Sequence, residues 1–293
     1  MRQDDVPSGN RRRSRSGLTG AGGSRSRARG QIRRTYTTAL NGYAAQLSGA
    51  RAERLAADPA VASVEQDRRV HSTATQTDAP WGLDRIDQPD LPLNGTYTYP
   101  DSGGGNSTVF VLDTGVRITH QDIAGRASYG WDFVDNDATA QDGNGHGTHV
   151  ATTAAGTTYG VAKKAKIVAA RVLDNNGSGT TAGVIAGVDW ITANRTAPSV
   201  ANVSLGGGAS TALDDAVRRS ITAGWATSDT ATHTGNGTSF AAPHVAGAAA
   251  VHLTNHPGAS PAAVGSALVN GATSNVLTGI GSGSPDKLLR LVP

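Results

Sequence analysis

The chain has 293 residues, which is enough for one large α/β domain and a smaller appendage. It contains no cysteine, which excludes disulfide bonds, a cysteine nucleophile and thiolate metal sites. Hydrophobic residues make up 37% and charged residues 17% of the sequence, as in ordinary globular proteins, and no apolar run is long enough for a membrane-spanning helix, so we expect no membrane contact.

The net charge of +3 is unevenly distributed along the chain. Residues 1–34 contain ten Arg and two Asp, whereas the remainder carries 16 basic and 21 acidic residues. Because residues 1–34 have almost no apolar side chains to bury, they are predicted to be a disordered, solvated tail. Non-specific binding of nucleic acid by this tail is the less favoured interpretation. The first residues lack a basic segment followed by an apolar one, so no secretory signal is expected here.

Residues 35–73 have a different character from the tail. The pattern over 35–47 predicts extended structure around a turn at Asn41-Gly42, followed by a short helix over 50–58 and a strand over 61–70. These elements are too few to build an independent core, so we expect them to pack on another part of the protein. The small polar residues of 71–80 are typical of an exposed linker.

From Trp81 onward, apolar strands alternate with amphipathic helices. Strands are predicted at 108–112, 166–172 and 199–205, and helices at 147–155, 181–193, 211–223, 239–253 and 261–270. Such alternation predicts an α/β fold, with a parallel sheet covered by helices on both faces.

Three short motifs carry residues suited to nucleophilic catalysis. Asp113 ends the strand of VFVLDTG, His146 begins a helix in DGNGHGTH, and Ser239 begins a helix in NGTSFAAPHVAG. A serine hydroxyl needs a base such as histidine, and the imidazole needs a carboxylate to orient it. Each motif alone is also typical of a turn or a helix cap. Together they predict Ser239 as nucleophile, His146 as general base and acid, and Asp113 as the orienting residue.

In these motifs and their order, the chain resembles the subtilisin-like serine proteases of the peptidase S8 family, most closely the proteinase K-like branch with its thermophilic relatives. The resemblance runs from about residue 35 to the end of the chain. It implies a secreted, monomeric serine endopeptidase that cleaves extended protein or peptide substrates, with apolar or aromatic residues preferred at P1. No cofactor is implied for the chemistry.

The resemblance also implies two substrate-binding segments. One edge strand would pair with the backbone of the substrate, and a second segment would face it, so that the peptide completes a small antiparallel sheet. The residues concerned are Ser204, Leu205 and Gly206 in the first segment, and Gly177, Ser178 and Gly179 in the second.

Residues 35–73 are similar to the C-terminal half of the inhibitory propeptide of the family, which acts as an intramolecular inhibitor. The resemblance implies cleavage within 71–76, leaving a mature chain that begins near Ala74. The propeptide would lack its first strand, replaced by the Arg-rich tail. The predicted organisation is a disordered tail over 1–34, a partial α+β propeptide over 35–73 and a subtilisin-like peptidase domain over 74–293.

Calcium is the structural ion that the resemblance suggests, in two oxygen-rich loops of the kind that hard cations prefer. The first, just before His146, contains Asp132, Asp135, Asp137, Thr139 and Gln141. The second, weaker in pattern, contains Asp84, Asp87, Gln88, Asn94 and Thr96. A solvated acidic turn is the alternative interpretation of the first loop.

The spacing of the motifs departs from the family in one place. Asp113 and His146 lie 33 residues apart, as the resemblance requires, but His146 and Ser239 lie 93 apart, about 60 fewer than it implies. We therefore predict an internal deletion near 224–225 and a sheet that lacks some strands. The missing segment would carry the asparagine that donates to the oxyanion, so a peptide-binding pseudoprotease is the alternative function. Asn236 is another candidate donor to the oxyanion.

Overall fold

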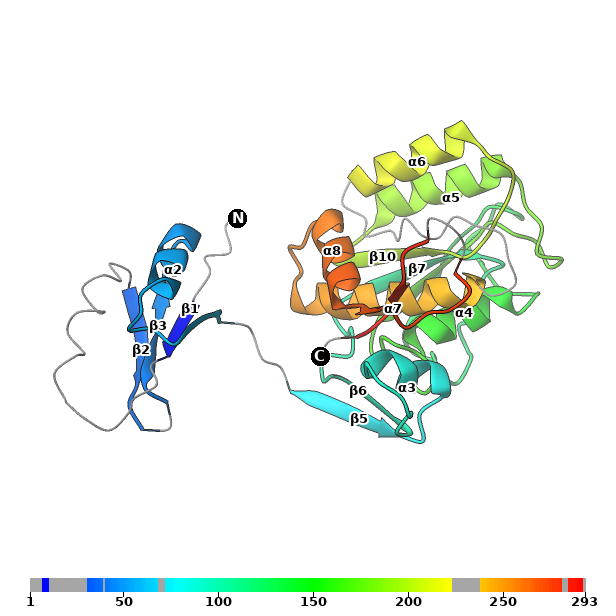
Figure 1. Ribbon diagram of the computed structural model, residues 1–293. Coiled ribbons are helices and arrows are strands. Elements are labelled where there is room, and N and C mark those ends of the chain that lie inside the picture. Colours follow the sequence, from blue (N-terminus) through cyan, green and yellow to red (C-terminus); the bar gives the residue numbers. More distant parts are fainter. Residues whose placement is uncertain are drawn as a thin grey trace. The chain divides into compact units, whose positions relative to one another are not determined.

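The computed structural model describes residues 7–10, 31–38, 40–67, 72–222, 238–280 and 284–291. The chain divides into two compact units, Met1–Val70 and His71–Pro293 (Figure 1), each with a hydrophobic cluster of its own. Across these ranges, no helix combines the length and apolar character needed to cross a membrane.

In its described residues, the first unit is an antiparallel sheet with the helix α2. Its strand order is β2-β3-β1-β4, and the helix α2 lies between β3 and β4 in the sequence. The bounds are β1 Pro7–Asn10, β2 Gln31–Tyr36, β3 Gly42–Gln46, α2 Gly49–Ala56 and β4 Ser63–Gln66. Tyr43, Ala45 and Leu47 on or just after β3 pack with Leu55 of α2 to form the cluster. The extended, helical and extended pattern predicted for 35–70 is present, with shifted bounds.

The structure differs from the prediction that residues 1–34 are a disordered tail. Strand β1 pairs with both β3 and β4, and the first four residues of β2 fall within the same range. The reason is that a strand can be held by backbone hydrogen bonds to its neighbours without burying apolar side chains of its own. Residues 1–6 and 11–30 lie outside the described part of the chain.

The second unit is built around a parallel sheet with the strand order β10-β7-β9-β8. The strands are β7 Thr108–Asp113, β8 Ala127–Asp132, β9 Lys166–Arg171 and β10 Ser199–Val203. The helices that cover it are α4 His146–Ala155, α5 Thr181–Asn194, α6 Thr211–Thr222, α7 Thr238–Asn255 and α8 Pro261–Gly271. Smaller elements are β5 Thr73–Thr77, α3 Trp81–Asp87, β6 Thr96–Pro100, β11 Thr273–Ser274 and β12 Lys287–Leu288.

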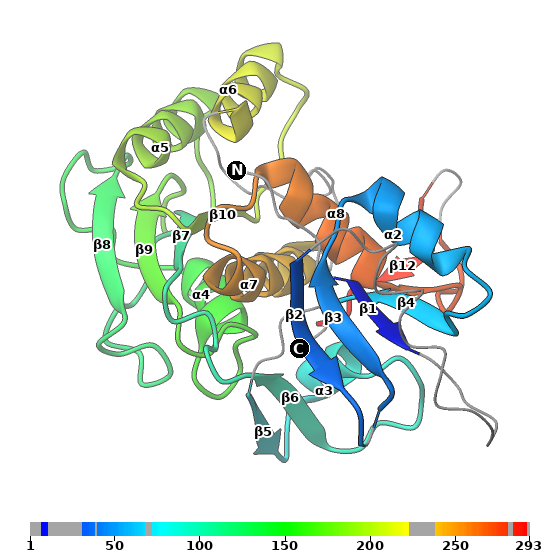
Figure 2. The same ribbon diagram turned by 90° about the vertical axis from the view of Figure 1, so that its left-hand side faces the viewer.

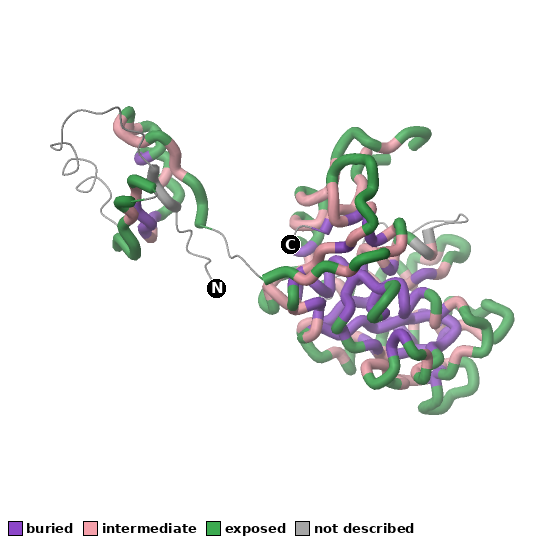
Figure 3. The backbone as a smooth tube through the Cα atoms, turned by 90° about the horizontal axis from the view of Figure 1, so that it is seen from below, coloured by how far each residue is buried: buried purple, intermediate pink, exposed green. Residues whose placement is uncertain are grey.

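Strand β7 shows why helices cover both faces of this sheet. Its side chains alternate, so Val109 and Val111 enter the cluster that contains α4 and α7, while Phe110 and Leu112 enter the cluster that contains α5. Figure 2 shows α5 and α6 on one side of the sheet and α4 and α7 on the other. The buried residues of this unit gather in its interior (Figure 3). The predicted α/β fold with a parallel sheet between helices is confirmed.

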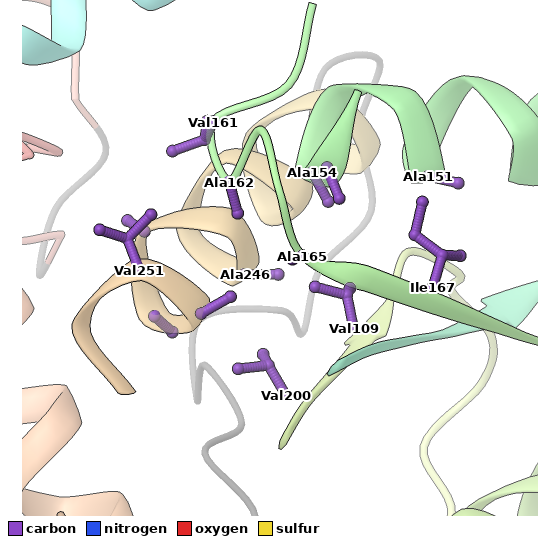
Figure 4. Packing of buried hydrophobic residues seen from close by; sticks show 14 of the residues in the cluster. Val109, Ala151, Ala154, Val161, Ala162, Ala165, Ile167, Val200, Ala246 and Val251 are labelled. Atoms are coloured by element: carbon purple, nitrogen blue, oxygen red, sulfur yellow. The ribbon is translucent and has the colours of Figure 1, made fainter. Parts of the chain in front are cut away.

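The layer formed by α4 and α7 is packed from small side chains. Figure 4 shows Ala154 of α4 and Ala246 of α7 close to Val161, Ala162 and Ala165 in the same cluster. At Gly247 of α7 the approach is closer still, because a Cβ atom there would lie 2.6 Å from the carbonyl oxygen of Ala154. Glycine and alanine therefore set how near the two helices lie, and these helices carry His146 and Ser239.

Candidate active site

Asp113 and His146 meet at the carboxyl end of β7. Asp113 is the last residue of β7 and is fully buried, and His146 is the first residue of α4. The Nδ1 atom of His146 lies 2.7 Å from Asp113 Oδ1, which also accepts a hydrogen bond from Thr114 N at 2.7 Å. Because a carboxylate only accepts hydrogen bonds, this contact places the ring proton on Nδ1 and leaves Nε2 as the basic atom.

The environment of His146 favours its charged form. The hydrogen bond to Asp113 is the largest influence and raises the pKa of His146, burial opposes it, and the charges of Asp113 and Asp142 add to the rise. The imidazole remains 31% exposed, so one side of the ring is open to solvent or to a substrate.

Ser239 is the second residue of α7, with a partly buried side chain. Its Oγ donates to the carbonyl oxygen of Ser204 at 3.4 Å. In the part of the chain that the structure describes, no hydrogen bond joins Ser239 to His146. Of the three predicted catalytic residues, Asp113 and His146 are thus in direct contact, and Ser239 contacts the first residue of the predicted substrate-binding strand.

The two predicted substrate-binding segments lie in loops at the carboxyl ends of strands. Ser204, Leu205 and Gly206 follow β10, which ends at Val203 and is two residues shorter than predicted. Gly177, Ser178 and Gly179 lie between β9 and α5, in a turn held by hydrogen bonds from Asn176 N and Ser178 N to Asp174 Oδ1. Within the described ranges, no hydrogen bond joins one segment to the other.

The first predicted calcium loop holds a cation of the protein itself. Arg171 Nη1 lies 2.6 Å from Asp132 Oδ2 and 2.6 Å from Asp135 Oδ2, and the guanidinium and Asp132 are buried. The other Asp132 oxygen accepts hydrogen bonds from backbone N–H groups of the loop. The remaining predicted ligands are also engaged, with Asp137 capping Thr139 N and Gln141 Oε1 accepting from the Tyr129 hydroxyl. These contacts do not fit the predicted calcium site, because the arginine already compensates the carboxylates.

The second predicted loop fits a calcium ion better. The Oδ1 atom of Asp87 and the Oε1 atom of Gln88 are buried acceptors without a hydrogen-bond partner, which calcium would supply. Burial is the main influence that raises the pKa of Asp87, and the nearby charge of Asp84 adds to it. Asn94 and Thr96, also predicted ligands, hydrogen bond to each other. In the described ranges no group of three or more His, Cys, Asp or Glu side chains is arranged for a metal ion, so amide and carbonyl oxygens would complete such a site.

Comparison with known protein families agrees with this geometry. A model described as "Subtilase family" matches residues 104–230 and 218–286. The chain belongs to the subtilase family. A second model, "Peptidase inhibitor I9", matches residues 3–73. The inhibitory propeptide of this subtilase therefore begins well before residue 35, at which the sequence pattern predicted its start.

Curated relatives of this subtilase are serine proteases. The extracellular serine proteinase of Thermus sp. (strain Rt41A) is 42% identical, in an alignment that covers 88% of this chain and 77% of the relative. Alkaline serine exoprotease A of Vibrio alginolyticus is 39% identical over 88% of this chain and 60% of its own length. A crystal structure of a cold adapted subtilisin-like serine proteinase matches with a TM-score of 0.69 and 39% identity, covering 74% of this chain and all of the other. The chain is accordingly a hydrolase of the subtilisin-like serine proteinase class.

The alignments also bear on the predicted internal deletion. The alignment with the Thermus proteinase spans 318 positions but includes 88% of the 293 residues, about 258, so about 60 positions have no counterpart in this subtilase. The subtilase model matches in two pieces that overlap at 218–230, around the predicted junction. Residues 224–225 and Asn236 lie outside the described residues.

Proposed function

We propose that this subtilase is a serine endopeptidase that hydrolyses peptide bonds through Ser239, His146 and Asp113. The observation that carries the proposal is the 2.7 Å contact between His146 Nδ1 and the buried Asp113 carboxylate at the carboxyl end of a parallel strand. Active sites of open α/β sheets form at such strand ends, and the contact leaves Nε2 of His146 free to act as a base.

The proposed reaction is acyl transfer. Ser239 Oγ attacks the scissile carbonyl and gives its proton to His146 Nε2, and the imidazolium that forms is stabilised by Asp113. The imidazolium then returns the proton to the leaving amine, and water hydrolyses the ester on Ser239 by the same route in reverse. The hydrogen bond from Ser239 to the Ser204 carbonyl must open before attack, which is compatible with the looser geometry of sites without substrate.

The proposed mechanism also requires hydrogen-bond donors to the oxyanion of the tetrahedral intermediate. The backbone N–H of Ser239, at the start of α7, is suited to donate to it. The side-chain donor that the family resemblance implies belongs to the segment without a counterpart here. Loss of one such donor lowers kcat by roughly 10²–10³-fold, so we expect a slow enzyme.

Substrate binding is proposed to follow the segments near Ser239. An extended peptide would pair with Ser204, Leu205 and Gly206 on one side and with Gly177, Ser178 and Gly179 on the other. The inhibitor region 3–73 is proposed to act as an intramolecular inhibitor until it is cut off. The name of the Thermus relative, an extracellular serine proteinase, favours an extracellular protein. Calcium would be held at the end of α3 by Asp87 and Gln88, as a structural ion.

The test is covalent labelling and peptide hydrolysis by the purified protein beside its Ser239→Ala variant. We expect a fluorophosphonate probe to modify the wild-type protein at Ser239, and hydrolysis of a chromogenic peptide to disappear in the variant. A folded protein that is neither labelled nor active would contradict the proposal and favour the peptide-binding pseudoprotease, which none of the comparisons supports.

A further inference from the structure

Asp142 joins the end of β7 to the first turn of α4. Its Oδ1 atom accepts hydrogen bonds from Asn144 N at 2.9 Å, Gly145 N at 2.8 Å and Thr114 Oγ1 at 2.9 Å. Its Oδ2 atom accepts from Thr148 N at 2.9 Å and from the Thr148 hydroxyl. One carboxylate therefore contacts the residue after Asp113 and the turn that presents His146.

Thr114 completes the link on the other side. Its buried hydroxyl donates to Asp142 and accepts a hydrogen bond from Gly147 N at 3.0 Å. Thr114 is next to Asp113 in the chain, and Gly147 is next to His146. The hydroxyl thus connects the two neighbours of the Asp113–His146 pair across 33 residues of sequence.

These contacts also replace a missing helix cap. The N-cap residue of α4 is Gly145, with φ of 110°, and it has no side chain to cap the helix. The first three free N–H groups of α4 are instead bound by side chains from outside the helix: His146 N by Asn144 at 3.2 Å, Gly147 N by Thr114 and Thr148 N by Asp142. The position of His146 is therefore set by residues that are fixed to the end of β7.

Asp142 is suited to this task because it stays ionised. Burial alone would raise its pKa, but hydrogen bonds from Gly145, Thr148 and Asn144 outweigh burial and hold the pKa of Asp142 below its usual value. Its negative charge in turn contributes to the raised pKa of His146. The carboxylate acts on His146 through both geometry and charge.

We propose that Asp142 and Thr114 form a positioning unit that holds His146 Nδ1 against Asp113 Oδ1. The inference rests on the proposed function, since His146, which the unit positions, is the residue proposed to transfer the proton. A simple role in stabilising α4 is the competing explanation. The two differ in what happens to the ionisation of His146 in a variant that remains folded.

The experiment compares matched variants by two measurements on the full chain. Thr114→Val keeps the shape of the side chain but removes the hydroxyl, Thr114→Ser keeps the hydroxyl, and Asp142→Asn keeps the size but removes the charge. Asp286→Asn is the control, because Asp286 likewise accepts two backbone N–H groups but in the C-terminal segment. The pKa of His146 is measured by NMR titration, with the signal assigned through a His146→Gln variant, and kcat and KM are measured as a function of pH.

We expect Thr114→Val and Asp142→Asn to lower the pKa of His146 and to reduce kcat by about 10- to 100-fold with little change in KM. Thr114→Ser and Asp286→Asn should behave like the wild type. An unchanged pKa of His146 in folded Thr114→Val protein, with only a lower Tm, would overturn the proposal. The titration does not need turnover, so an inactive wild-type protein would contradict the proposed function while the pKa values still decide the role of the unit. If Asp142→Asn does not fold, the Thr114→Val and Thr114→Ser pair gives the answer.

Discussion

Two influences act in opposite directions on the pKa of His146. Hydrogen bonding to Asp113 favours the imidazolium, whereas partial burial favours the neutral ring, and the first effect is the larger. The catalysis proposed for Ser239 requires a neutral imidazole, because only that form accepts the serine proton. The contact with Asp113 that orients His146 therefore also raises the pH above which His146 is neutral and able to act as a base.

The first prediction concerns the pH dependence of activity. Because the pKa of His146 is raised, kcat/KM should rise with pH through a value above 6.5, the usual pKa of histidine. In an Asp113→Asn variant the main cause of the rise is gone and burial remains, so this limb should move to lower pH. The variant should also lose roughly 10⁴-fold in kcat, because the tautomer of the ring is no longer held. A profile whose acidic limb does not move would show that another group controls it.

At the level of elements, α4 and α7 pack against each other and carry the two side chains that are proposed to react, those of His146 and Ser239. The helices approach closely because small residues lie between them, and Gly247 leaves no room for a Cβ atom beside Ala154 and Val161. Since close-packed interiors tolerate little added volume, this contact is sensitive to a single methyl group.

The second prediction uses two glycines in helices as a matched pair. Gly247→Ala places a Cβ atom 2.6 Å from Ala154 O and from Val161 Cβ, and should destabilise the protein by about 1–3 kcal/mol. Gly265→Ala in α8 meets no atom within 4 Å and should stabilise it by roughly 0.5–1 kcal/mol, because alanine has the better helix propensity. Denaturant unfolding measures both changes. Equal effects of the two substitutions would refute the packing argument.

The third prediction concerns the loop after α3 and its unpartnered acceptors. Calcium at about 100 times its Kd should stabilise the protein by about 2.7 kcal/mol, which raises Tm by roughly 5–10 °C in a domain of this size. Asp87→Ala should abolish the calcium-dependent rise in Tm. Asp132→Asn should retain it, because Asp132 pairs with Arg171. Scanning calorimetry with calcium and with a chelator measures the change in Tm. If Asp132→Asn alone loses the calcium-dependent rise, calcium binds in the loop before His146 and not after α3.

At the scale of the whole molecule, the predicted internal deletion has to be compatible with a fold that matches that of a subtilisin-like serine proteinase. The described sheet has four strands, and the alignment with the Thermus proteinase leaves about 60 positions without a counterpart. The two faces of the sheet nevertheless bury apolar clusters against helices. Strand β7, which ends at Asp113, lies beside β10, which ends one residue before Ser204. The described sheet thus contains the two strands, β7 and β10, that lie next to the candidate active site.

The fourth prediction tests the consequence of the predicted internal deletion. Insertion of the corresponding segment of the Thermus relative between residues 224 and 225 should raise kcat by roughly 10²–10³-fold, because it returns the oxyanion donor that the family resemblance implies. A flexible Gly/Ser insert of equal length is the control and should give no gain. If the native segment brings no more activity than the Gly/Ser insert, the shortened chain already has its own donor.

Much of the architecture could be predicted because it follows from local patterns. The alternation of apolar strands and helices from residue 108 onward located β7, β9, β10 and the helices α4 to α8 to within two residues at each end. The segments that form α3, β6 and β8 were not predicted, and β5 lies within residues 71–80, which were predicted as an exposed linker. Strand β8, with the sequence ASYGWD, has only exposed or partly buried residues before Asp132, so its pattern lacks the signal of a buried strand.

The sequence by itself determined the class of fold and predicted the candidate catalytic residues and their order, since the first depends on periodicity and the second on short motifs. Only the tertiary structure decided what the polar side chains contact. Parallel pairing of β8 with β9 places Arg171 beside Asp132, 39 residues away, and so fills a loop whose composition predicted calcium. Likewise, Thr114 and Asp142 are 28 residues apart in the sequence. They are in contact only because the first turn of α4 packs against the carboxyl end of β7. The register of strands and the docking of helices are long-range properties, and local sequence patterns do not specify them.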